Sequence, residues 1–179
     1  MARLPYLDPE SLLPEDRELL KHPINLRRQL VHSPNLARTF GGVMRYFRHQ
    51  STLNPRLREL AILQVGWTAR APYEWSHHVK IGADFGVTED DVRAICAGGA
   101  GLGDLERAVL DAARHLTKEA SLTDAQFAAL RAHLSETELV DLLAVIGFYA
   151  CVVRVLAGLQ VDVEPEYQPY LDRFPLPES

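Results

Sequence analysis

The sequence predicts an all-α protein in which helical hairpins surround one long, buried helix near the C-terminus. Between about residue 25 and residue 163, apolar side chains recur every three or four positions, as they do along the buried face of a helix. Residues that favour helix starts precede most of these segments. No segment alternates apolar and polar residues in the way that predicts a strand.

The chain divides into three expected parts. Its 179 residues are enough for one domain with a substantial core. Residues 1–24 are rich in proline and charge and predict an N-terminal arm with one short helix over residues 15–21. Residues 25–163 form the expected helical domain. Residues 164–179 contain four prolines and predict a C-terminal tail.

Proline and capping residues mark the first helices of the domain. Ser33-Pro34 and Asn54-Pro55 each offer a capping side chain followed by proline at the first helical position. Pro72 ends the second of these helices and opens a third, because the residue before a proline disfavours helical geometry. We expect this third helix to end near residue 82 or residue 86.

Capping boxes mark the later helices. Thr88, Thr123 and Ser135 each stand three residues before an acidic or amide side chain that can bond back to the backbone. The first box predicts a short helix that stops at a glycine pair. Between the first and second boxes, residues 105–119 predict an amphipathic helix.

The last box opens a long apolar segment that includes residues 139–159. This segment is long enough to cross a bilayer. However, Asp141 and Arg154 lie inside it, and each charge is costly in lipid. We therefore expect a helix covered by its neighbours, and no membrane partner.

Composition excludes several classes of function. The net charge is −5 and no run of lysine and arginine occurs, so nucleic-acid binding is not expected. No apolar run of a signal peptide follows the N-terminus, which predicts a cytoplasmic protein. Cys96 and Cys151 are far apart and are expected to act as small apolar residues within helices.

The segment R-A-P-Y-E-W-S-H-H-V at residues 70–79 concentrates chemically active residues. Glu74 and His78 are four residues apart and share a helix face, with His77 on the adjacent edge. A carboxylate beside an imidazole raises its pKa and orients the ring, which suits proton transfer near neutral pH. The alternative is a solvated ion pair that contributes a few tenths of a kcal/mol.

Glu59 lies on the preceding helix, which should pack antiparallel to the helix of His78. At 1.5 Å per residue, Glu59 is ~16 Å before the turn and His78 ~9 Å after it. Contact between them would need a long side chain, a bridging water or a crossing angle. The alternative is a surface glutamate beside Arg56 and Arg58.

Three sequence runs carry a resemblance: N-P-R-L-R-E-L-A-I-L-Q-V, Y-E-W-S-H-H and G-V-T-E-D-D-V. Together they resemble the carboxymuconolactone decarboxylase and alkylhydroperoxidase D-like superfamily, closely over about residues 40–100 and loosely over residues 105–159. The resemblance implies a compact, all-α alkylhydroperoxidase D-like domain. It also implies a homo-oligomer (dimer, trimer or hexamer) with sites near subunit boundaries.

The peroxidase branch of that superfamily uses a glutamate, a C-x-x-C pair and a histidine. Glu59 matches the glutamate and His78 the histidine, but the cysteine positions fall on Ala71 and Glu74. Because a thiolate must attack the peroxide, the chain is not expected to act as a thiol peroxidase.

The decarboxylase branch also lacks the cysteine pair. By resemblance, the protein would be a lyase that decarboxylates, or transfers a proton on, a small carboxylated lactone or enolisable ring, without metal or other cofactor. His78 would be the general acid or base, with Glu74 tuning it and Glu59 as a second acid or an orienting group. We expect His78 to face an enclosed hollow. The substrate contacts expected are Arg70, Tyr73 and His77.

Three alternatives remain open. The protein could be a peroxidase-related member of the superfamily, with peroxiredoxin activity ascribed to it, that lacks the thiol pair. It could be a helical oligomer that binds a small ligand without catalysis. Finally, Glu74-x-x-His77 has the spacing of a di-iron ligand pair, to which Glu59 could add a ligand, although no second E-x-x-H occurs.

Overall fold

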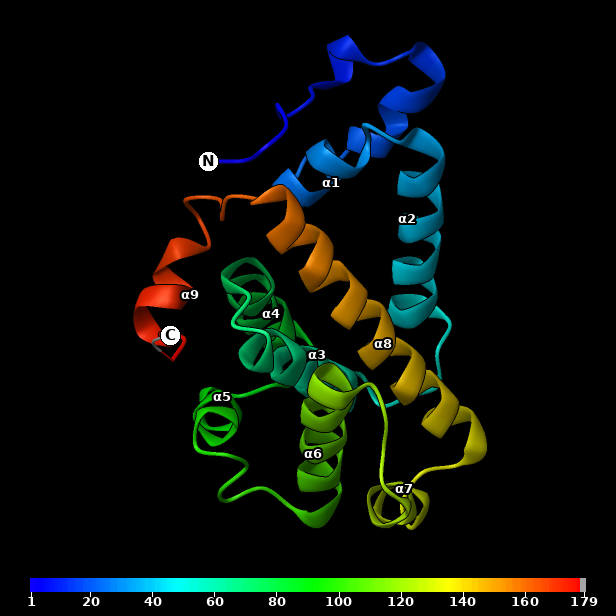
Figure 1. Cartoon of the computed structure of the whole chain (residues 1–179), viewed down its shortest axis with the longest axis vertical. Coiled ribbons are helices and arrows are strands. Elements are labelled where there is room, and N and C mark those ends of the chain that lie inside the picture. The colour runs from blue at the N-terminus through cyan, green and yellow to red at the C-terminus, as the bar shows by residue number, and fades with distance from the viewer. Residues whose placement is uncertain (178–179) are drawn as a thin grey trace.

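The computed structural model describes residues 1–177 and confirms the all-α prediction: no strand occurs among these residues (Figure 1). The N-terminal segment contains two 3₁₀ helices, η1 and η2, and nine α-helices follow within the described range. The bounds are η1 Pro9–Ser11, η2 Pro14–Leu20, α1 Asn25–Leu30, α2 Pro34–His49, α3 Pro55–Thr68, α4 Pro72–Asp84, α5 Glu89–Cys96, α6 Asp104–Glu119, α7 Asp124–Arg131, α8 Glu136–Leu159 and α9 Gln168–Arg173.

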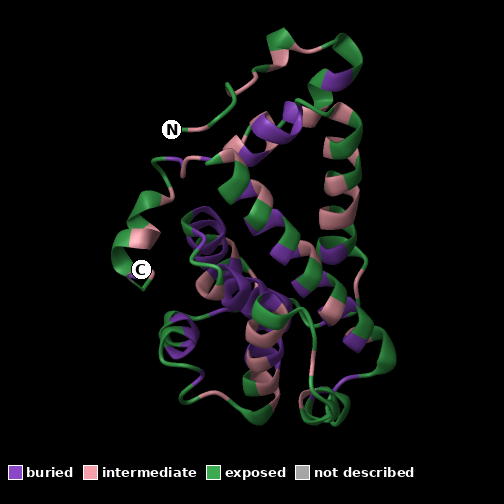
Figure 2. Cartoon of the chain, viewed as in Figure 1, coloured by how far each residue is buried: buried purple, intermediate pink, exposed green. Residues whose placement is uncertain are grey.

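Helix α3 is the centre of the fold. It packs against α4, α5, α6 and α8, and its residues 57–66 are all buried. Burial on every side explains why this helix is apolar around most of its circumference. Figure 2 shows the buried residues concentrated on α3, α4 and the inner faces of α6 and α8.

Local hydrogen bonds set most of the helix starts. The predicted capping boxes at Thr88, Thr123 and Ser135 are all formed. The Asn54 side chain accepts hydrogen bonds from two backbone N–H groups at the start of α3. Ser33 also precedes its helix as expected, but its side chain makes no capping bond.

Helix α8 is the long apolar helix of the prediction. It is long and apolar enough to cross a bilayer, a test that core helices of soluble proteins also pass. One face packs against α3 and α6, whereas Val140 on the other face is 65% exposed. Asp141 is buried, and its two carboxylate oxygens accept hydrogen bonds from Tyr46 at 2.8 Å and Ser51 at 2.6 Å.

The C-terminal segment is more ordered than the tail expected from its prolines. Helix α9 packs against α4, on the side away from α2 (Figure 1). The Trp75 indole is fully buried and donates a hydrogen bond of 2.7 Å to the backbone oxygen of Phe174. This bond anchors the segment to the core.

The prediction for the two cysteines is wrong. Cys96 at the end of α5 and Cys151 on α8 are both free thiols and both exposed. Each is helical as expected, but each lies on the outer face of its helix, where an apolar contact is not required.

Candidate functional site

The hairpin of α3 and α4 positions the predicted acid/base residues. The helices approach closely at Gly66, where an added Cβ would lie 3.2 Å from the backbone nitrogen of Trp75. Arg70 makes the turn between them in the left-handed conformation, with φ of 50°, and its side chain is exposed. A residue larger than glycine at position 66 would therefore separate the two helices that carry the site.

His78 lies directly between two carboxylates. Its Nδ1 atom is 2.6 Å from Oε2 of Glu59, and its Nε2 atom is 2.9 Å from Oε1 of Glu74. The three residues are between 2% and 5% exposed. The Glu59 contact is direct and needs no bridging water, so the offset estimated from straight helices does not separate the two side chains.

Arg58 holds the other side of Glu59. Its Nε donates to Oε1 of Glu59 at 3.0 Å, and its Nη1 donates to the backbone oxygen of Phe47, at the end of α2, also at 3.0 Å. The guanidinium stacks over the Phe85 ring at 4.6 Å. Glu59 is therefore oriented by one cation on each side, Arg58 and His78. The position of Arg58 next to Glu59 in the sequence did not by itself indicate this arrangement.

Electrostatics keep the central pair charged. Burial by itself would lower the pKa of His78, but the charges and hydrogen bonds of Glu59 and Glu74 outweigh it and raise the pKa to about 9. Burial would likewise raise the pKa of Glu59, but His78 and Arg58 hold it below its usual value. His78 is therefore an imidazolium at neutral pH.

Tyr149 of α8 covers the imidazole. The two rings meet edge to face, with centroids 5.2 Å apart and planes at 85°. Burial, followed by the charges of Glu74 and Glu59, raises the pKa of Tyr149, so its hydroxyl stays protonated. Nothing in the local sequence spacing of Tyr149 points to α4, so sequence reasoning did not place this residue at the site.

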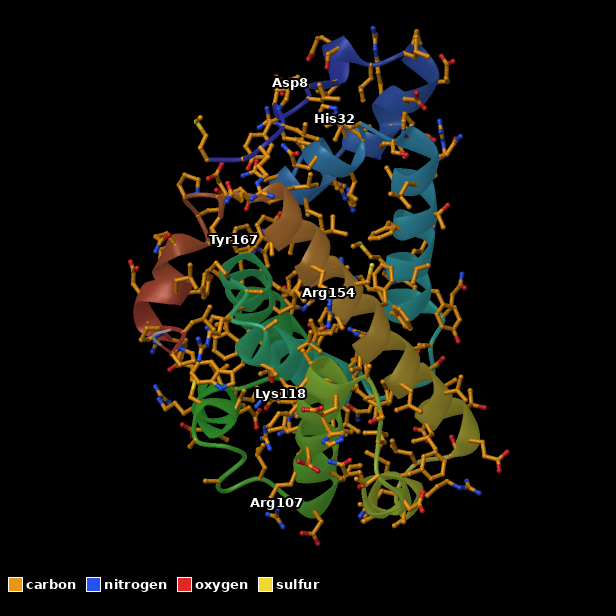
Figure 3. All side chains as sticks on the ribbon, viewed as in Figure 1. Asp8, His32, Arg107, Lys118, Arg154 and Tyr167 are labelled. Atoms are coloured by element: carbon orange, nitrogen blue, oxygen red, sulfur yellow. The ribbon has the colours of Figure 1, made fainter. Side chains whose placement is uncertain are left out.

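Two of the expected substrate contacts, Tyr73 and His77, belong to a second cluster around Glu164. The Tyr73 hydroxyl accepts a hydrogen bond from the N–H of Leu26 and donates one to Oε1 of Glu164, each 3.1 Å long. His77 donates from Nδ1 to the backbone oxygen of Tyr73 at 2.8 Å, and its Nε2 lies 3.2 Å from Oε2 of Glu164. Its ring stacks between those of Tyr73 and Tyr167. Figure 3 labels Tyr167, which directly precedes α9.

This second cluster joins α1, α4 and the segment before α9. The role of Tyr73, His77 and the exposed Arg70 as substrate contacts stays a prediction. The cluster depends on Glu164, which is buried and lies about ninety residues from its partners in the sequence. No helical spacing could have indicated that contact.

The di-iron arrangement is not formed by the residues expected for it. Glu74 contacts His78, whereas His77 turns to Glu164, so the two residues of the E-x-x-H motif point to different partners. Within residues 1–177, no three His, Cys, Asp or Glu side chains are arranged to hold a metal ion.

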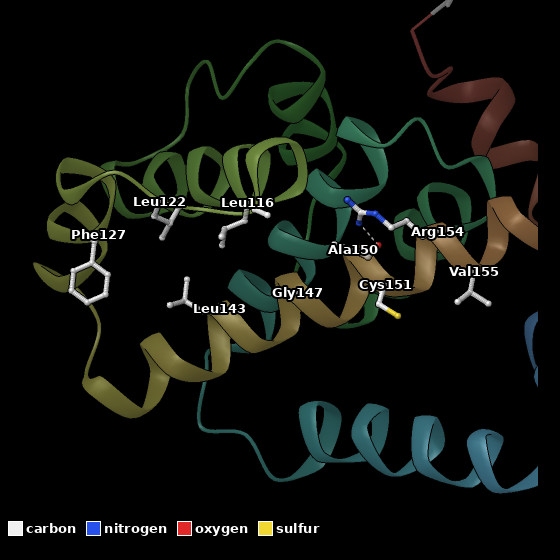
Figure 4. A pocket seen from close by; sticks show the side chains of 10 residues that line it. Leu116, Leu122, Phe127, Leu143, Gly147, Ala150, Cys151, Arg154 and Val155 are labelled. Carbon is white, nitrogen blue, oxygen red and sulfur yellow. Dashed lines mark hydrogen bonds between the residues drawn. The ribbon is translucent and has the colours of Figure 1, made fainter.

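The two hollows described in the structure lie away from His78. The larger, about 790 Å³, is an apolar groove between α8 and the segment from α6 to α7; Phe127, Leu143 and Cys151 line it (Figure 4). The other lies between Trp67, the end of α5 and the segment after α9. Neither provides the enclosed hollow that was expected beside the imidazole.

The sequence profile of the carboxymuconolactone decarboxylase family matches residues 34–119, which include both helices of the hairpin. No protein of curated function is similar enough in sequence to count as a relative.

Several solved structures share the fold over nearly the whole chain. An uncharacterized peroxidase-related protein with an alkylhydroperoxidase AhpD core, from Ralstonia eutropha JMP134, has a TM-score of 0.81 and 20% identity, covering 95% of each chain. A peroxidase-related protein from Silicibacter sp. TM1040 has a TM-score of 0.76 and 19% identity over 92% of each chain.

A third structure is a cysteine-to-alanine variant of the debrominase Bmp8 in complex with 2,3,4-tribromopyrrole. Its TM-score is 0.81 at 21% identity, over 97% of this chain and 100% of that chain. At such identities the likeness shows the fold alone, so the chemistry must be argued from the site.

Proposed function

Because the chain belongs to the carboxymuconolactone decarboxylase and alkylhydroperoxidase D-like superfamily, we propose that it is an acid/base enzyme related to the decarboxylases. Its substrate would be a small carboxylated lactone or an enolisable ring. The observation that carries the proposal is the imidazolium of His78, held between the carboxylates of Glu59 and Glu74. A buried proton donor with two acceptors is suited to moving a proton without sulfur.

The two carboxylates have different roles in this proposal. Glu59 is bound by both Arg58 and His78, which suits an orienting group. Among the described residues, His78 is the one ion-pair partner of Glu74. Glu74 can therefore exchange a proton with a substrate. In the peroxidase pattern, the position of Glu74 is taken by a cysteine of the C-x-x-C pair. Glu74 therefore stands where that pattern has a reactive group.

The reaction needs a proton at one defined point. When the bond between the substrate ring and its carboxyl carbon breaks, carbon dioxide leaves and the electron pair stays on the ring as an enolate. The relay of His78 and Glu74 then delivers a proton to the ring carbon that carried the carboxyl group. A positioned acid of this kind contributes about 10²–10⁴-fold to the rate.

Thiol chemistry has less support. Ala71 and Glu74 occupy the positions of the cysteine pair. Although Cys96 is an exposed residue, partial desolvation of its sulfur raises the pKa of the thiol, which reduces its thiolate fraction. The debrominase structure contains a small halogenated ring, so a protein of this fold accommodates a ligand of about the size proposed.

Carbon dioxide release from a carboxymuconolactone and from a set of ring β-keto acids tests the proposal. We expect turnover by the wild type and by His133→Gln, a control at an exposed histidine, and a loss of about 100-fold or more in His78→Gln. Equal rates in His78→Gln and the wild type would overturn the proposal, as would the absence of turnover on every substrate. Peroxide consumption with a dithiol would favour the peroxidase-related alternative.

We also propose that the protein assembles with copies of itself, as the superfamily relationship implies. The apolar groove along α6, α7 and α8 is an exposed surface that such an assembly could cover. Light scattering after size-exclusion chromatography tests this, and a monomer at micromolar concentration would contradict it.

A further inference from the structure

The smaller hollow of the structure lies apart from the acid/base cluster. Its volume is about 470 Å³, which is within the range of pockets that hold small molecules. It is lined by residues at the ends of α3, α5 and α9, and the end of α9 lies beside α5 (Figure 1). Glu59, Glu74 and His78 are not among its lining residues, so the hollow needs an explanation of its own.

Aromatic rings form walls of this hollow. Trp67 and Phe174 both line it. The Trp67 ring packs against the ring of the fully buried Trp75, with centroids 5.1 Å apart, and the Trp75 indole donates its hydrogen bond to the backbone oxygen of Phe174. Both walls are therefore fixed to the core before any ligand arrives, which lowers the entropic cost of binding a flat ring between them.

The rim of the hollow is cationic. Arg93 and Arg173 are its two charged lining residues, and among the described residues no acidic side chain lines it. Their guanidinium carbons lie 5.8 Å and 5.6 Å from the centroid of the Phe174 ring, close enough for a cation–π contact. The positive charges are therefore held directly beside an aromatic wall.

One carboxylate oxygen serves both arginines. Oε2 of Glu89 lies 3.0 Å from Nη2 of Arg93 and 2.6 Å from Nη2 of Arg173. Asp90 also pairs with Arg93, at 2.8 Å, but its side chain is 94% exposed, so water screens its charge. Because each guanidinium has five N–H donors, both arginines keep donors for an anion that enters the hollow.

We propose that this hollow binds a small, flat aromatic carboxylate. The ring lies against Trp67 and Phe174, and the carboxylate pairs with Arg93 and Arg173 at the rim. A neutral aromatic ligand would leave the two guanidiniums unused, and a small inorganic anion would leave the aromatic walls uncovered. The inference goes beyond the proposed acid/base function and does not depend on it.

Calorimetric titration of the full-length protein with 2-naphthoate and with 2-naphthamide, at fixed ionic strength, tests the inference. The two probes have the same ring and nearly the same shape, but only naphthoate carries a charge. We expect the wild type to bind naphthoate about ten-fold more tightly than naphthamide, because hydrogen bonds between charged groups are the stronger ones.

Three arginine variants show where the charge preference arises. Arg93→Met and Arg173→Met should each reduce the preference for naphthoate several-fold. The matched control is Arg131→Met, which removes an exposed arginine that pairs with Glu136 and does not line the hollow. This control should keep the wild-type preference.

Cys96 reports on occupancy of the hollow independently of the titration. Its thiol lines the hollow, whereas the second exposed thiol, Cys151, lines the groove along α8 and serves as an internal control. Saturating naphthoate should slow the alkylation of Cys96 by iodoacetamide several-fold and leave that of Cys151 unchanged, as followed by peptide mass spectrometry.

Four results would overturn the inference. The first is equal binding of naphthoate and naphthamide, or binding of neither. The second is a wild-type preference in both Arg93→Met and Arg173→Met. The third is naphthoate binding that leaves Cys96 unprotected, and the fourth is protection of Cys151 in its place, which would assign the ligand to the groove along α8.

Discussion

Replacing His78 by glutamine should remove most of the dependence of stability on pH in the neutral and mildly alkaline range. In the folded protein the pKa of His78 rises from its ordinary value of 6.5 to about 9. At ~1.4 kcal/mol for each factor of ten in proton affinity, that rise corresponds to about 3 kcal/mol. His78 is fully buried, so solvent does not reduce this figure appreciably.

The direction follows from proton binding. Below pH 6.5 both the folded and the unfolded protein hold the proton, and the stabilisation is fully present. Between pH 6.5 and about pH 9 the unfolded chain loses the proton while the folded protein keeps it. The free energy of unfolding therefore falls as the pH rises. Above that range the contribution is lost.

Urea unfolding followed by tryptophan fluorescence at several pH values measures this effect. Across this pH range, the free energy of unfolding should fall by about 3 kcal/mol in the wild type and in His133→Gln. In His78→Gln it should fall little. Glu74→Gln keeps the imidazole and one of its carboxylates, so it should show an intermediate slope even if His78→Gln folds poorly. Identical slopes in the wild type, Glu74→Gln and His78→Gln would show that proton binding at His78 does not stabilise the fold.

Three further substitutions test the contacts around the site by urea unfolding. Trp75→Phe leaves the buried backbone oxygen of Phe174 without a donor and should cost about 1–3 kcal/mol, while an unchanged midpoint would show that the C-terminal segment is not anchored there. Tyr73→Phe should lower the free energy of unfolding by about 1–3 kcal/mol and leave carbon dioxide release per folded molecule unchanged. Lost turnover without a loss of stability would instead support the predicted role of Tyr73 in substrate binding. Arg58→Met breaks a buried ion pair with Glu59 and should cost about 3–5 kcal/mol, and a cost below ~1 kcal/mol would contradict the assigned anchoring.

Much of the fold could be predicted from the sequence because short-range bonds decide it. The capping boxes at Thr88, Thr123 and Ser135 place three helix starts through contacts within four residues. Ser33 shows the limit of such signals, since Pro34 opens its helix without any side-chain cap. The exposed cysteines were mispredicted because apolar composition does not specify which face of a helix is covered.

The centre of the site was also visible in the sequence. Glu74 and His78 are one helical turn apart, and Glu59 is on the helix just before. The expected offset between Glu59 and His78 treated the two antiparallel helices as straight rods. Their close approach at Gly66 and the length of the glutamate side chain allow direct contact.

The surroundings of the site could not be predicted because they come from distant segments. Tyr149 is more than seventy residues from His78, and Glu164 is about ninety residues from Tyr73. The prolines after residue 163 suggested a tail, yet they flank the buried carboxylate of Glu164. Only tertiary packing brings these side chains to α4.

The two carboxylates of Glu59 and Glu74 hold His78 as an imidazolium. Its ring ¹⁵N chemical shifts, followed by NMR as the pH is raised, test this most directly. We expect both nitrogens to stay protonated through neutral pH and the ring to titrate near pH 9. A neutral ring with a single protonated nitrogen at pH 7, titrating at or below the ordinary histidine pKa of about 6.5, would contradict it.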